Sequence, residues 1–265
     1  MPTITKKSKD KVLPLAVALS PDTDKKVIND PLFYPPSEDG LHVSEETYWA
    51  DYYEHPDFNY EWNNGILEEK GMSDRYTYLM YMWFTQLILE YLKYNPIAQT
   101  IGLETGGRIL LPHKTAIRKP DLGIVLNSNP IPYQGNDKSY QGTFDMCVEA
   151  ISKSRNVHKT RDTIDKKEDY ALGGVKEYYI LDGEKEETAF YHLDTHGEYK
   201  EIKSEDGIIR SNVLPNFQFR LSDLYKRPPV EELRHDEVYK HFVALNLQTA
   251  EAEIEHLKAL LNKHN

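Results

Sequence analysis

Two acidic residues stand beside short apolar runs in the middle of this 265-residue chain: Asp121 in RKPDLGIV and Glu149 in FDMCVEAIS. Both runs are typical of buried β-strands, where an unpaired carboxylate costs several kcal/mol. A divalent cation bound by both carboxylates would remove that cost. The pattern therefore favours a core with strands and a metal site at the strand ends.

A lysine on the following helix could complete such a site. The segment TRDTIDKKEDYALGG predicts a helix that begins at Thr160 or Asp162 and ends at the glycine pair 173–174. Within it, Asp162, Lys166 and Asp169 are spaced by four and three residues, so they share one side of the helix. Lys166 can then face the two acids.

The chemistry that these residues could support is phosphodiester hydrolysis. Alternate residues of a strand share a face, so Asp121 and Glu149 converge if their strands are neighbours. Mg²⁺ held by both acids would lower the pKa of a bound water, while Lys166 offsets charge on the phosphoryl oxygens. Glu61, in NYEWNNG, could supply a further acid.

Each residue also has a simpler explanation. An acid next to a strand is more often a cap or a member of a surface ion pair. Lys166 stands beside Lys167, which is typical of a solvated helix face. The functional interpretation therefore depends on the whole series and not on any one member.

The remaining chain alternates between helix and strand patterns. Ser44 is a suitable N-cap for a short helix in VSEETYWADYYE, and the turn 63–65 joins two predicted strands. Apolar residues at helical spacing predict a long core helix from Tyr76 to Tyr94. Three further strands are predicted in IAQTIGLE, GRILL and DLGIV, and we expect these to form a meander. Two more are predicted in DMCVEAIS and VKEYYILD. The runs TAFYHLD, YKEIK and IIRS are expected to form a closing antiparallel layer. Residues 127–142 form a predicted surface loop, and LSDLY a short helical turn.

We expect three parts in the chain: a flexible N-terminal arm over residues 1–40, a main domain over 41–228 and a C-terminal helix over 229–265. The helix carries an apolar seam with steps of four and three, formed by Val243, Leu247, Ala250, Ile254, Leu257 and Leu261. Such a seam predicts a homo-oligomer through a short coiled coil. A helix that folds back on its own domain would show the same stripe.

Composition limits the cellular context and the partners. The formal net charge of −11 argues against a basic surface that coats nucleic acid, so any DNA contact is expected to be local. The single cysteine, Cys147, excludes an internal disulfide framework and fits a cytoplasmic protein. The apolar run from Val12 to Leu19 resembles a signal peptide, but it is short and is broken by Pro14, so we expect it to belong to the N-terminal arm. No stretch of the sequence is apolar over enough residues to span a membrane.

The order of these motifs resembles the Uma-type family of putative restriction endonucleases, within the PD-(D/E)XK nuclease superfamily. The resemblance covers roughly residues 43–225. Its most specific parts are the pair Pro120 and Asp121, the pair Val148 and Glu149, and the run 161–182.

The resemblance implies an α/β fold, namely a restriction-endonuclease-like core with a central mixed β-sheet flanked by helices. It implies that Asp121 and Glu149 bind the metal and that Glu61 is an acid near the start of the domain. It also implies that Lys166 is the catalytic lysine. In the superfamily this lysine usually lies two positions after the second acid, where this chain has Ile151. The resemblance therefore implies a lysine that has migrated to the helix. Two positions depart from the family pattern: Lys153 replaces a common proline, and MSDRYTYL lacks a histidine.

Three functions remain open at this point. The first is an endonuclease that uses Mg²⁺ or Mn²⁺ to cut DNA. The second is a catalytically inactive protein with a nuclease fold that acts in binding or assembly. The third is a metal-dependent hydrolase of a small phosphorylated molecule.

Overall fold

The computed structural model describes residues 36–102 and 104–264. The chain divides into two units, Met1–Glu38 and Asp39–Asn265, and the second contains all the helices and strands described below. Nearly all of the predicted arm, including the apolar run from Val12 to Leu19, lies outside the described residues.

A six-stranded mixed sheet forms the centre of the second unit, with the strand order β10-β9-β8-β7-β6-β3. Its strands are β3 (Ala98–Gly102), β6 (Leu122–Leu126), β7 (Met146–Ala150), β8 (Glu177–Leu181), β9 (Ala189–Leu193) and β10 (Tyr199–Glu201). Only β7 and β8 are parallel neighbours within this sheet. A parallel pair needs a long crossover, which here is helical: α4 (Asn156–Thr160), the π-helix η2 (Arg161–Asp165) and α5 (Lys166–Leu172).

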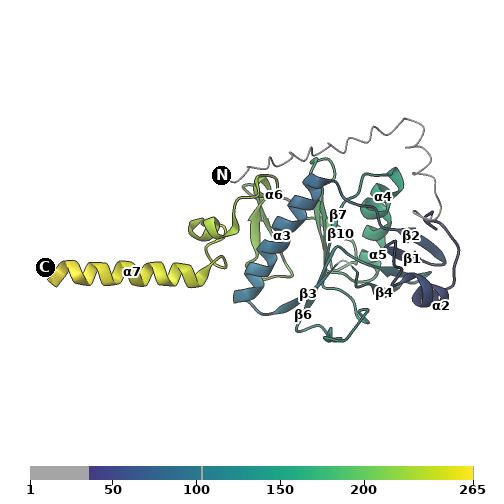
Figure 1. The fold of residues 1–265 in the computed structure, drawn as a ribbon, viewed down its shortest axis with the longest axis horizontal. Coiled ribbons are helices and arrows are strands. Elements are labelled where there is room, and N and C mark those ends of the chain that lie inside the picture. Colours follow the sequence, from purple (N-terminus) through teal and green to yellow (C-terminus); the bar gives the residue numbers. More distant parts are fainter. Residues whose placement is uncertain (1–35, 103, 265) are drawn as a thin grey trace, which may run out of the picture. The chain divides into compact units, whose positions relative to one another are not determined.

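Helices cover both faces of this sheet, as the resemblance implies (Figure 1). The long helix α3 (Arg75–Tyr94) packs on the face that carries Met146 and Val148 of β7. Cys147 lies on the opposite face and packs in a cluster with Tyr170 of α5. Because side chains alternate along a strand, Glu149 points to the same face as Cys147, toward α5. Cys147 itself is a free, buried thiol.

A second, four-stranded sheet has the order β2-β1-β5-β4. Its strands are β1 (Tyr60–Asn63), β2 (Ile66–Glu69), β4 (Gly107–Leu110) and β5 (Thr115–Arg118). Asn64 and Gly65 adopt φ values of 48° and 100° in the predicted turn between β1 and β2. The short helix α2 (Glu45–Thr47) continues as the π-helix η1 (Tyr48–Tyr52) beside this sheet, and Ser44 caps it as predicted.

The predicted meander is wrong. β3 pairs with β6 in the central sheet, whereas β4 pairs with β5 in the second sheet. The sequence analysis missed β5, a four-residue strand next to a charged segment. Gly107 is the first residue of β4, where the ring of Phe144 leaves no room for a side chain: a Cβ would lie 2.7 Å from its Cε2.

Two other boundaries differ from the prediction. The helix expected at Thr160 or Asp162 begins at Asn156, and its N-cap residue, Arg155, makes no side-chain capping bond that would mark the start. The segment IIRS forms β11 (Ile208–Arg210), which pairs with β12 (Gln218–Arg220) in a separate two-stranded sheet and does not join the central sheet.

The C-terminal part contains α6 (Leu221–Lys226), the 3₁₀ helix η3 (Val230–His235) and α7 (Leu245–His264). The core continues beyond Pro228, because Val230, Tyr239 and Phe242 are buried in the same cluster as α3. Val243, the first residue of the predicted seam, is also buried there. Across the described residues, none of the helices combines the length and apolar character that crossing a membrane requires.

Candidate active site

The two acids of the sequence prediction lie close together. β6 and β7 are antiparallel neighbours, with Leu122 opposite Val148, so the residue before β6 lies near the end of β7. Asp121 accepts a hydrogen bond through Oδ2 from the backbone N–H of Ala150, at 2.7 Å. The two carboxylates also share one cation, because the Nζ of Lys70 lies 3.0 Å from Asp121 Oδ1 and 3.6 Å from Glu149 Oε2.

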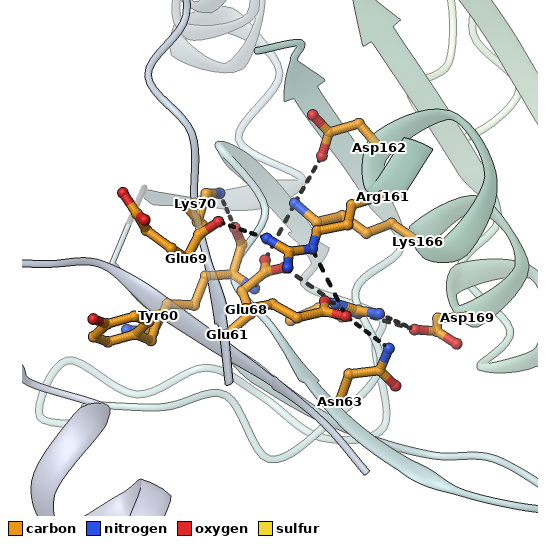
Figure 2. Close-up of polar contacts among 12 residues, drawn as sticks. Tyr60, Glu61, Asn63, Glu68, Glu69, Lys70, Arg161, Asp162, Lys166 and Asp169 are labelled. Atoms are coloured by element: carbon orange, nitrogen blue, oxygen red, sulfur yellow. Dashed lines mark hydrogen bonds and ion pairs between the residues drawn. The ribbon is translucent and has the colours of Figure 1, made fainter. Parts of the chain in front are cut away.

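Lys166 faces this cluster from α5. Its Nζ lies 3.1 Å from Glu149 Oε1, 3.3 Å from Glu61 Oε1 and 3.0 Å from Asp162 Oδ1. Its side chain is only 4% exposed, so it is not part of a solvated helix face. Figure 2 shows Lys166 and Asp162 on the helix facing Glu61 of the hairpin.

Glu61 connects the second sheet to the cluster. Besides Lys166, its carboxylate accepts the backbone N–H of Lys119 at 2.7 Å and an N–H of Arg118 at 3.3 Å. It is 1% exposed. All four residues proposed from the sequence for the site, Asp121, Glu149, Lys166 and Glu61, are therefore buried in one network of contacts.

Arg118, which was not singled out from the sequence, connects the second sheet to the crossover helix. It is fully buried and binds Glu61, Glu68 and Asp169, with Nη2 lying 2.6 Å from Asp169 Oδ2. Asp169 shares the helix side of Lys166, as predicted, but it pairs with this arginine and lies outside the acid pair.

A small cavity of about 20 Å³ lies among these side chains, roughly the space that one water molecule or ion needs. It is lined by Glu61, Glu69, Lys70, Gly71, Asp121, Glu149, Ala150, His158, Arg161, Asp162 and Lys166. His158 is buried with its Nδ1 2.9 Å from Ser154 Oγ, and its Nε2 has no hydrogen-bond partner within the described part of the chain. The cavity therefore brings a histidine to the same place as the acids.

Burial and nearby charge shift the protonation of this cluster. Burial raises the pKa of Glu149 to about 8, although Lys166 and Lys70 oppose the shift. Burial would also raise the pKa of Glu61, but Lys166, Lys70 and Arg118 lower it to about 2. Burial would lower the pKa of Lys166, yet its three carboxylate partners hold it above the usual range. The charge of Glu149 at neutral pH therefore depends on a cation beside it.

The donor set fits a hard divalent ion. Carboxylate oxygens of Asp121 and Glu149 and the carbonyl oxygen of Lys119 surround one point, and oxygen ligands of these two kinds suit Mg²⁺ and Mn²⁺. That point is filled by the ammonium group of Lys70. In the region the structure covers, no three histidine, cysteine or carboxylate side chains are grouped so as to hold a metal.

The sequence analysis missed Lys70, Arg118 and His158. Lys70 ends the charged run EEK, which resembles a solvated strand end, and Arg118 stands next to another basic residue. The nearest available signal was the position of Arg118 and Lys119 directly before Pro120 and Asp121.

A solved structure shares this architecture. The crystal structure of a putative nuclease belonging to DUF820 from Anabaena variabilis ATCC 29413 matches with a TM-score of 0.53 and 13% identity, covering 70% of this chain and 98% of that one. The fold is therefore of the nuclease type, with a central mixed sheet flanked by helices. The curated proteins include no match.

The sequence model of the family Uma2, described as putative restriction endonuclease, matches residues 46–222. The chain belongs to this family. Family and fold together support a nuclease role with a nucleic-acid substrate, and enzymes of the restriction-endonuclease type typically use a divalent metal ion.

Proposed function

We propose that the protein is an endonuclease that hydrolyses phosphodiester bonds of DNA with the help of Mg²⁺. The observation that carries the proposal is the convergence of Asp121, Glu149, Lys166 and Glu61 on one cavity. Asp121 directly precedes β6, and the other three come from β7, from α5 and from β1. Burying this many charged groups is energetically costly, and a site that serves only stability would not need them. Their convergence therefore favours a functional site.

The roles follow from the contacts. Asp121 and Glu149 would hold the ion, together with the carbonyl oxygen of Lys119. A bound Mg²⁺ supplies Lewis acidity and lowers the pKa of water. Lys166 places its charge next to Glu149, where it can stabilise the phosphoryl oxygens of the transition state. Glu61 positions Lys166 through the 3.3 Å contact and can orient a water molecule.

Plasmid cleavage tests this assignment. Wild-type protein is incubated with supercoiled DNA and Mg²⁺ or Mn²⁺, beside Asp121→Asn and Glu149→Gln. Each variant should lose about a hundredfold or more in cleavage rate, because it lacks one carboxylate ligand of the ion that stabilises the transition state. Asp223→Asn is the matched control, because Asp223 is equally buried but lies on α6 and binds Tyr239. Cleavage that survives when Asp121→Asn and Glu149→Gln are combined in one protein would exclude the assignment.

A further observation favours self-association through α7. Leu247, Ile254, Leu257 and Leu261 keep the predicted seam spacing and are 45%, 51%, 52% and 65% exposed. A second copy of the same helix could bury this face as a short coiled coil. Self-association through α7 would also be expected if this protein does not cut DNA and acts in binding or assembly, so this observation also suits that alternative function.

Analytical ultracentrifugation tests the oligomer. The double variant Leu257→Lys and Leu261→Lys should sediment as a smaller species than the wild type. Ala259→Lys, on another side of α7, is the control. An unchanged sedimentation coefficient in the leucine variant would exclude the coiled coil.

A further inference from the structure

We infer that Lys70 is the resident cation of the acid pair, and that a divalent ion binds between Asp121 and Glu149 only by displacing the ammonium group of Lys70. The inference rests on the proposed function, because it assigns the position of the metal in that same site. It adds a residue, Lys70, that would set the metal affinity of this chain.

The contacts of Lys70 define the position. Its Nζ contacts three oxygen atoms: the carbonyl oxygen of Lys119, Asp121 Oδ1 at 3.0 Å and Glu149 Oε2 at 3.6 Å. These are the same atoms that would coordinate a hard divalent ion. An ammonium group and a metal ion cannot both occupy this point, because they would contact the same three oxygen atoms.

Lys166, the second buried lysine, does not occupy the proposed metal position. Lys166 binds Oε1 of Glu149, whereas Lys70 binds Oε2, so each oxygen of this carboxylate has its own cation. Replacing the ammonium group of Lys70 by a metal ion therefore leaves the contact between Lys166 and Glu149 in place. The site could contain a metal ion and one lysine together.

Displacement of the ammonium group requires the side chain of Lys70, and not its backbone, to move. Lys70 directly follows β2, and the backbone after it is tightly packed: a Cβ at Gly71 would lie 2.2 Å from His158 Nδ1 and 2.4 Å from Ser152 Oγ. The side chain of Lys70 is 11% exposed, so it already reaches solvent at one point. A lysine side chain has a flexible four-carbon stem, so rotation can carry the ammonium group out while the backbone stays fixed.

Calorimetric titration of Mn²⁺ tests the inference with a readout other than activity. Lys70→Met removes the charge and keeps the length of the side chain. This variant should bind Mn²⁺ about tenfold more tightly than the wild type, or better, because the competing cation is gone. Adding Asp121→Asn to Lys70→Met should abolish the gain. Lys200→Met, which removes an exposed lysine paired with Glu198, should leave the affinity unchanged.

The outcomes separate the two claims. Equal affinity of the wild type and Lys70→Met for Mn²⁺ would overturn the role of Lys70 and leave the metal-dependent nuclease standing. Absence of binding by both proteins would overturn both.

A second measurement avoids any problem with folding of the variant. Reductive methylation of wild-type protein, followed by mass spectrometry, reports which lysines are accessible. Lys70 should be protected without metal and become reactive once Mn²⁺ is bound, while Lys166 stays protected. Protection of Lys70 in the Mn²⁺-saturated protein would contradict displacement.

Discussion

At the scale of single residues, the site is held by a few buried cations that neutralise a larger number of acids. Arg118 has no exposed surface and contacts three carboxylates, while Lys70 and Lys166 divide the oxygens of Glu149 between them. A buried ion pair is a poor source of net stability, but removing one partner is costly because the other charge stays buried and unpaired. The arginine is therefore the residue on which folding of this region should depend most.

The first prediction is that Arg118→Met lowers the free energy of unfolding by about 3 to 5 kcal/mol, because Glu61, Glu68 and Asp169 lose their shared partner. Urea denaturation followed by circular dichroism measures the change. Arg210→Met is the control: this arginine pairs with Glu205 at the surface, and its loss should cost no more than about 1 kcal/mol. Equal losses in the two variants would show that the buried network is not important for stability.

The sequence identified the acids of this site but not most of its cations. Asp121 and Glu149 stand out because an unpaired carboxylate beside a buried strand is costly, and helical spacing placed Lys166 on the side that faces them. Lys70 gives no such signal, because it follows two glutamates at a strand end. Its role depends on the hairpin of the second sheet lying against the central sheet, a contact between distant segments that no local pattern encodes.

At the scale of secondary-structure elements, local patterns predicted most helices and strands but not their partners. The helix α3 and the hairpin of β1 and β2 were predicted because periodicity and turn residues are local. The division of strands between two sheets was not, because pairing is decided by tertiary contacts. The π-helix within the crossover, which contains Asp162 and directly precedes Lys166, has no recognised sequence signature.

The turn between β8 and β9 gives the second prediction. Asp182 accepts backbone N–H groups of Glu184, Glu186 and Glu187 and pairs with Lys153. Burial would raise its pKa, but these donors lower it below the ordinary value of 3.8. Because the folded-state pKa is the lower one, the stabilisation is present above 3.8 and is lost as pH falls through the folded-state value.

Asp182→Asn should therefore destabilise the protein by about 2 kcal/mol at neutral pH, where the wild-type carboxylate is charged. The difference between wild type and variant should shrink as the pH is lowered toward about 3. Urea denaturation at a series of pH values measures both effects. A difference that stays constant over this range would mean that the charge of Asp182 does not contribute.

At the scale of the whole molecule, the formal charge of −11 has to be reconciled with the proposed DNA substrate. Affinity for DNA arises largely from Lys and Arg groups that replace counterions on phosphates. Here many of the cations near the site are already paired with acids, including Lys70, Arg118, Arg161 and Lys166. A divalent ion bound between Asp121 and Glu149 would add positive charge where the phosphate has to bind.

The last prediction is therefore that DNA binding depends on the metal. Lys166→Met is suited to the measurement, because it keeps Asp121 and Glu149 and should not cut. Fluorescence anisotropy with a labelled duplex measures the Kd. In EDTA at physiological salt the Kd should be about 10⁻⁴ M or weaker, which is the weak end of nonspecific binding. Mg²⁺ or Mn²⁺ should strengthen it, and Asp121→Asn should remove the gain. Tight binding in EDTA would instead point to a DNA surface away from the acids, because the metal would then contribute nothing to association.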